Sequence, residues 1–134
     1  MKYYTDGFLN GRGNPCPRGG GYTIADEKGK VIEHEQISSS SLTNNEAEVT
    51  GIVRVLEICH TLDEISTDSK VCLIWVKAGF SRTRPDLDSL LKICNRLWHE
   101  KMVNLHWERR EKNLAGFLNE FSRGKLAKGY INII

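Results

Sequence analysis

The stretch "MKYYTDGFLN" at residues 1–10 has the alternating pattern of a β-strand and delivers one acid followed by a glycine. The acid is Asp6, and Asp-Gly is a common hairpin dipeptide, so a turn explains it without any further function. The alternative is a metal ligand, because the end of a rigid strand holds a side chain with the positional precision that catalysis needs. One acid does not decide between these interpretations, so the evidence must come from the rest of the chain.

The composition predicts one globular domain that spans residues 1–134. Hydrophobic residues make up 40% of the chain and charged residues 27%, which is enough for an apolar core. The apolar stretches are far shorter than a membrane span, and the N-terminus lacks the basic start and apolar block of a secretion signal. We therefore expect a soluble cytoplasmic monomer with no membrane partner.

The cysteines and histidines do not have the spacing of a zinc site or a disulfide framework. The cysteines show no C-x-x-C pairing, and three of them lie among apolar neighbours, so we expect reduced thiols in the core. The histidines are scattered without ligand spacing. These residues are Cys16, Cys59, Cys72 and Cys94, and His34, His60, His99 and His106.

The formal net charge of +2 conceals an asymmetry between the two halves of the chain. Residues 1–68 carry 11 acids and 6 Lys or Arg, whereas residues 69–134 carry 6 acids and 13 Lys or Arg. An acidic cluster beside a basic surface is expected of a metal-dependent enzyme that acts on a polyanion. Two solvated faces of opposite charge are the simpler explanation, so the asymmetry alone assigns no function.

Three short strands open the chain, at residues 2–8, 20–26 and 31–39, and segments rich in turn formers separate them. This pattern predicts a β-meander. The next segment, residues 43–62, has apolar residues at the i, i+3, i+4, i+7 spacing of an amphipathic helix. A helix therefore follows the three strands.

The second half of the chain alternates strands and helices. Residues 64–69 predict a short strand, and residues 69–79 an apolar helix that Gly79 stops. A longer helix starts near Pro85 and runs to about Glu100, residues 103–110 alternate as a strand, and residues 113–126 return to helical spacing. The order predicts an α/β fold, a mixed sheet with helices packed on its faces.

Two glutamates in "TNNEAE" at residues 43–48 have different expected roles. If Thr43 is the N-cap of the helix, Glu46 falls at N3, where its side chain reaches back to the cap amide in a capping box. Glu48 has no comparable role and lies beside the apolar stripe, an unusual place for an unpaired carboxylate. In "STDS" at residues 66–69, Asp68 ends a strand, and its alternative role is the N-cap of the following helix.

Asp6, Glu48 and Asp68 together indicate a metal site. Two of them end strands and the third lies near the start of a helix that packs on the same sheet, which can bring them within a few ångströms of one another. Like charges this close repel unless a divalent cation neutralises them, and all-oxygen ligands select a hard ion such as Mg²⁺ or Mn²⁺.

Four motifs make the chain resemble the type 1 ribonuclease H family. They are "YTDG" at 4–7, "GNPCPRGGGY" at 13–22, "TNNEAE" at 43–48 and "STDS" at 66–69, in the family's order and at its usual spacing. Each motif is weak by itself, and the four in register over nearly the whole chain are a strong signal. The resemblance implies the ribonuclease H-like fold, a five-stranded mixed sheet flanked by helices.

The resemblance also implies an endonuclease that hydrolyses the RNA strand of RNA/DNA hybrids by a two-metal-ion mechanism. Asp6, Glu48 and Asp68 match three of the family's four metal-binding carboxylates, with Asp6 expected to bridge two Mg²⁺ ions that Mn²⁺ can replace. Hybrid recognition requires contact with a 2′-hydroxyl and with deoxyribose across a wide, shallow minor groove. By resemblance, the expected contacts to sugars and the minor groove are Asn14, Asn44 and Asn45, and the expected contact to a DNA phosphate is Thr43.

The chain departs from the family pattern at the fourth acid. In "RREKNLAGFLNEF" at residues 109–121, Gly116 stands where relatives carry an Asp in the first turn of the last helix. Glu120 lies four residues further, on the same helical face about 6 Å along the axis, and is the tentative fourth catalytic carboxylate. Glu111, in the loop before this helix, is the alternative.

Two functions stay open at this point. The first is an active ribonuclease H, and the second is a catalytically impaired module that binds RNA/DNA hybrids with the same fold. The three retained acids favour the enzyme, because binding a polyanion does not require clustered negative charge. Exonucleases, integrases and junction resolvases share the fold, so the fold alone does not assign a function.

Overall fold

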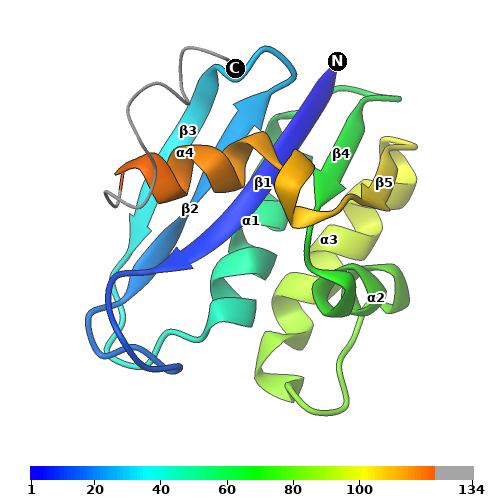
Figure 1. The fold of residues 1–134 in the computed structure, drawn as a ribbon. Helices are drawn as coiled ribbons and strands as arrows, with labels where there is room; N and C mark the ends of the chain where they lie inside the picture. Colours follow the sequence, from blue (N-terminus) through cyan, green and yellow to red (C-terminus); the bar gives the residue numbers. More distant parts are fainter. Residues whose placement is uncertain (123–134) are drawn as a thin grey trace.

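A computed structural model of the protein describes residues 1–122 and has an α/β fold, a five-stranded mixed sheet with helices on both faces (Figure 1). The strands are β1 Lys2–Leu9, β2 Gly20–Asp26, β3 Val31–Ile37, β4 Glu64–Thr67 and β5 Asn104–Trp107. The helices are α1 Asn44–Ile58, α2 Lys70–Ala78, α3 Asp88–Glu100 and α4 Leu114–Ser122, with the 3-10 turns η1 Pro85–Leu87 and η2 Arg110–Lys112. The predicted order of elements is confirmed over these residues, and the predicted residues 123–126 of the last helix lie outside them.

Strand β1 lies at the centre of the sheet, whose strand order is β3-β2-β1-β4-β5. It pairs antiparallel with β2, and β2 pairs antiparallel with β3, which is the predicted meander. On its other side β1 is parallel to β4, and β4 is parallel to β5. Because β1 and β4 run in the same direction, their carboxyl ends meet at one edge of the sheet.

Two expected strands are longer than the observed ones, and the pairing explains both differences. Residues 31–39 were expected to form one strand, but β3 ends at Ile37, which pairs with the first residue of β2, Gly20. Residues 103–110 were expected to form another, but β5 covers Asn104–Trp107, because its partner β4 is only four residues long. A strand extends only as far as its neighbour supplies hydrogen bonds.

The helices form two layers of unequal size. Helix α4 packs across β1 and β2 on one face of the sheet, and α1, α2 and α3 cover the opposite face (Figure 1). The larger core lies under α1 to α3, and a smaller one under α4 contains Tyr4, Ala25, Ala115 and Leu118. All four cysteines are buried and free, as predicted. No helix in the described part of the chain is long and apolar enough to cross a membrane.

The caps of α1 and α2 confirm one prediction and correct two. Thr43 caps α1, and its hydroxyl accepts a hydrogen bond from the Glu46 amide at 3.2 Å. The Glu46 carboxylate does not complete the capping box and lies 3.9 Å from the Arg84 guanidinium. Ser69 caps α2 by accepting from the Cys72 amide, so the capping role considered for Asp68 is wrong. Gly79 ends α2 with a φ of 82°, as expected of a left-handed C-cap.

Helix α1 approaches β1 most closely at Gly7. A Cβ atom on this residue would lie 2.6 Å from the Glu48 nitrogen and 2.8 Å from the Ala47 carbonyl carbon. Both are backbone atoms of α1, which cannot move aside as a flexible side chain can. Only glycine at this point of β1 therefore lets the start of α1 lie against the strand.

Gly7→Ala should lower the free energy of unfolding by about 1–3 kcal/mol, because the new methyl group forces α1 away from β1. The measurement is urea denaturation followed by circular dichroism. Gly11→Ala is the control, since its Cβ would meet the Arg18 side chain at an ordinary 3.5 Å. Equal stability of the Gly7→Ala protein and the control would contradict the close approach.

Candidate active site

Asp6, Glu48 and Asp68 meet at the edge of the sheet where β1 and β4 end. Each offers one carboxylate oxygen, and the three oxygens lie within 4.8 Å of one another. Asp6 comes from β1, Asp68 directly follows β4, and Glu48 reaches the same point from the first turns of α1. The fold therefore brings together the three acids that the sequence singled out.

Glu48 is the most buried member of this cluster, with 3% of its surface exposed. Its Oε1 accepts a hydrogen bond of 2.7 Å from the Gly7 amide, whereas its buried Oε2 has no hydrogen-bond partner. Burial, and then the charge of Asp6, raise the pKa of Glu48 well above its ordinary value. An orphaned oxygen among like charges is unfavourable, and a cation facing it would remove this cost.

The pKa values of the two aspartates are raised as well. Burial, followed by the charge of Asp68, raises the pKa of Asp6 to about 6, although a hydrogen bond from Asn119 opposes this shift. Burial also raises the pKa of Asp68, and the positive charge of Arg110 opposes it. The site therefore holds more negative charge than its own cations balance, which is the electrostatic condition for binding a divalent ion.

The three acids lie in an open surface groove of about 500 Å³. Its walls also include Asn44 at the start of α1, Ser69 at the start of α2, and Arg110 in η2. The Trp107 indole donates to the Asp68 carbonyl oxygen at 3.1 Å, which ties the end of β5 to this edge of the sheet. A groove of mixed charge open to solvent can admit an extended anionic ligand.

The four residues expected to contact a hybrid gather around the start of α1. The side-chain oxygen of Asn14 accepts from the Asn44 amide at 3.0 Å, so these two asparagines are adjacent. The Thr43 hydroxyl accepts from the Arg84 guanidinium at 2.7 Å. Asn45 is half-buried instead, and its side-chain oxygen lies 3.7 Å from the Cys72 sulfur. Asn44, which lines the groove, is therefore flanked by Asn14 and Thr43, and Asn45 lies against Cys72 of α2.

The position expected for a fourth acid does face the site. A Cβ on Gly116 would lie 3.8 Å from the Asp6 carboxylate. Asn119, one turn later on α4, donates from Nδ2 to Asp6 Oδ2 at 2.7 Å. The side chain of Glu120 lies outside the described part of the structure, so its role as a fourth ligand stays a prediction, and Glu111 is exposed in η2.

Sequence reasoning did not identify Asn119. The i+4 spacing from Gly116 selected Glu120, but the i+3 spacing places Asn119 on the same face of a helix, and a carboxamide was not considered as a partner for Asp6. An Asn directly after the apolar Phe117 and Leu118 was the available signal, since a buried amide requires polar partners.

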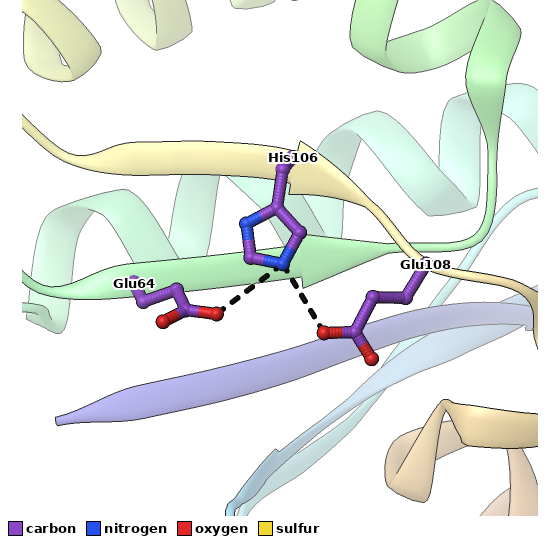
Figure 2. A group of neighbouring side chains, drawn as sticks. All are labelled: Glu64, His106 and Glu108. Atoms are coloured by element: carbon purple, nitrogen blue, oxygen red, sulfur yellow. Dashed lines mark hydrogen bonds and ion pairs between the residues drawn. The ribbon is translucent and has the colours of Figure 1, made fainter.

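A second group of ligand-type side chains lies on β4 and β5, away from the three acids (Figure 2). His106 Nε2 lies 3.3 Å from a Glu64 oxygen and 3.1 Å from a Glu108 oxygen. The Lys2 ammonium contacts Glu108 as well and lies 3.4 Å from Glu64. His106 thus gains carboxylate neighbours through the sheet register, which the sequence spacing did not indicate. Because the Lys2 ammonium already lies against both carboxylates, we assign this group to an ion-pair network.

Comparison with solved structures places this fold among ribonucleases H. LC11-RNase H1, isolated from compost by a metagenomic approach, is 30% identical with a TM-score of 0.63, over 94% of this chain and 97% of that one. Its complex with an RNA/DNA hybrid matches at 27% identity and a TM-score of 0.60, over 84% and 87%. RNase H1 from the halophilic archaeon Halobacterium salinarum NRC-1, at 22% identity and a TM-score of 0.65 over 92% and 97%, shares the fold.

No family model and no curated protein matched the chain. The five-stranded sheet and its helices nevertheless define a ribonuclease H-like protein. At 30% identity over almost the full length of LC11-RNase H1, the chain belongs to the type 1 ribonuclease H family.

Glu48→Gln should stabilise the metal-free protein at pH 8 by about 1–2 kcal/mol, because it removes a buried charge and keeps an oxygen for the Gly7 amide. Thermal unfolding in EDTA would show this as a rise of roughly 4 °C per kcal/mol. Glu35→Gln, on the exposed side of β3, is the control and should leave the melting temperature unchanged. A lower melting temperature for Glu48→Gln would show that the charge does not strain the fold.

The stability of the metal-free protein should also fall as the pH rises. The pKa values of Asp6 and Glu48 are raised in the folded state, so ionising these groups costs more when folded than when unfolded. Their penalty is absent below about pH 4, where both states are protonated, and grows as the pH passes through the folded pKa of Asp6, about 6. Urea denaturation in EDTA at pH 5 and pH 8 should show a larger loss for the wild type than for Glu48→Gln. Equal losses would refute this explanation.

Proposed function

We propose that this protein is an endonuclease that hydrolyses the RNA strand of RNA/DNA hybrids, acting as a single domain. The observation that carries the proposal is the buried Glu48 oxygen that lacks a partner and lies among two further carboxylates. Membership of the type 1 ribonuclease H family supports the choice of substrate, and one structural neighbour was solved with an RNA/DNA hybrid.

The donor set fits divalent cations of the hard class. Asp6, Glu48 and Asp68 offer only oxygen atoms, which Mg²⁺ and Mn²⁺ prefer. Two such ions held by these residues would supply Lewis acidity at both ends of an in-line phosphodiester displacement. By the resemblance to the family, Asp6 is the proposed ligand that the two ions would share. Glu120 is retained as the proposed fourth ligand from α4.

The residues around the groove have complementary roles in holding the hybrid. Arg110 lines the groove and its charge acts on both Asp6 and Asp68, so it offsets the repulsion between the acids and an incoming phosphate. The Thr43 hydroxyl, fixed by Arg84, is the proposed phosphate contact on the other rim. Asn14, Asn44 and Asn45 are the proposed contacts to sugars and base edges, and the first two are already held against each other.

Gly116 favours a second candidate function, a hybrid-binding module with impaired catalysis. This residue lies beside Asp6 but supplies no carboxylate, so one cation position has fewer ligands than in relatives with an acid there. Weaker occupancy of that position would slow hydrolysis without preventing hybrid binding. The two functions differ in turnover and not in affinity for the hybrid.

The deciding assay is cleavage of a hybrid labelled on its RNA strand, in Mg²⁺ and in Mn²⁺. We expect cutting of the RNA strand of the hybrid and not of duplex DNA or duplex RNA. Asp68→Asn should reduce the rate by at least ~100-fold, because it removes a cation ligand. Glu120→Gln should do the same if Glu120 is the fourth ligand, and Glu35→Gln should have no effect.

Each result of this assay has a definite meaning. Cleavage that persists in Asp68→Asn would contradict the proposed metal site. Cleavage that Glu120→Gln leaves intact would exclude Glu120 and keep the enzyme. Binding of the hybrid by the wild type without cleavage in either metal would replace the enzyme with the binding module.

A further inference from the structure

A line of polar side chains crosses the sheet on the face that α4 packs against, from the exposed His34 on β3 to Asp6 on β1. Asp6 pairs directly opposite Thr23 on β2, and Thr23 pairs directly opposite His34 on β3. Residues that are opposite in register project from the same face of a sheet. Asn119 of α4, with 3% of its surface exposed, contacts both Asp6 and Thr23.

The chemistry of these groups fixes the direction of every hydrogen bond in the line. An ionised carboxylate only accepts, so Asn119 must present its amino group to Asp6 Oδ2, at 2.7 Å, and its oxygen to Thr23. The Thr23 hydroxyl therefore donates its one hydrogen to the Asn119 oxygen. His34 Nδ1, 2.7 Å from the same hydroxyl, is left as the donor to Thr23. The chain runs from His34 through Thr23 and Asn119 to Asp6.

We infer that Asn119 is a positioning residue that orients the Asp6 carboxylate for cation binding, and that Thr23 holds Asn119 in place. This inference rests on the proposed function. The terminal torsion of an aspartate is soft, so its plane is set by its hydrogen bonds. A carboxamide locked at both ends is a rigid donor, whereas a freely rotating one is not. Hydrogen-bond partners of metal-ligating side chains commonly set metal affinity in this way.

Two further features make this series of hydrogen bonds rigid. The His34 ring stacks on Phe8 of β1, with ring centroids 5.1 Å apart and planes 7° from parallel. The Asn119 backbone belongs to α4, whose Leu118 is packed in the core under that helix. His34 and Asn119 are therefore both attached to packed elements, and Asn119 has little freedom to follow a displaced Asp6.

Three variants of the full-length chain test the inference by the binding of Mn²⁺, followed by electron paramagnetic resonance. Asn119→Leu removes the donor at similar volume and should weaken Mn²⁺ binding by about 10-fold or more. Thr23→Val removes the hydroxyl that orients the amide and should weaken it by roughly 3- to 10-fold. Thr23→Ser keeps the hydroxyl and should stay within about twofold of the wild type, as rescue by the conservative variant.

Thermal unfolding in EDTA shows which variants are folded. If Asn119→Leu does not fold, the matched pair at Thr23 decides the question. Folded Thr23→Val and Thr23→Ser proteins that bind Mn²⁺ equally well would overturn the inference. A wild type that binds Mn²⁺ but does not cut the hybrid would overturn the proposed function instead, so the two failures are distinguishable.

The tautomer of His34 gives a test that involves no metal. The hydrogen bond from His34 to Thr23 requires the hydrogen on Nδ1, so nuclear magnetic resonance at pH 8 should show the Nδ1–H tautomer of the imidazole. Thr23→Val should shift His34 toward the Nε2–H form, because the acceptor of the Nδ1 hydrogen is lost. A wild type with the hydrogen on Nε2 would contradict the direction of the chain.

Discussion

The contact between Gly7 and the start of α1 determines the geometry of the candidate site. Because Gly7 has no side chain, α1 lies directly against β1 at this residue. The Gly7 amide then donates a hydrogen bond to the Glu48 carboxylate. Without this approach, Glu48 on α1 would not reach Asp6 on β1 and Asp68 after β4. The parallel pairing of β1 with β4 supplies the other half of the geometry, because it brings Asp6 and Asp68 to the same edge.

The clustered carboxylates lower the stability of the metal-free fold, and the same carboxylates are the proposed cation ligands. The three carboxylates lie close together, burial is the largest cause that raises the pKa of each, and one oxygen of Glu48 lacks a hydrogen-bond partner. Folding tolerates the cost because the two cores on either side of the sheet are well packed. The basic second half of the sequence contributes to this site through Arg110, which lines the groove beside the acids and opposes the rise in the pKa values of Asp6 and Asp68.

The sequence predicted the fold and the three converging acids because these follow from local patterns. Alternation marked the strands, helical spacing marked α1, and Thr43 was correctly identified as its cap. One of the two misjudged contacts is local, and the other depends on packing across the sheet. Ser69 and not Asp68 caps α2, a choice between neighbouring residues of similar capping propensity. Asn119 contacts Asp6 because of the way α4 is rotated about its axis. Spacing from Gly116 alone does not determine whether residue 119 or residue 120 faces Asp6.

The rotation of α4 is set by its core residues. Ala115 and Leu118, three residues apart, pack against Tyr4 and Ala25 on the sheet. Each is followed by a residue that faces Asp6, namely Gly116 and Asn119. A single rotation of α4 about its axis therefore places two residues in the small core and two at the site. A side chain larger than glycine at 116 would have to share the space beside Asp6 with the Asn119 amide. The packing of α4 therefore places Gly116 and the Asn119 amide side by side at the Asp6 carboxylate.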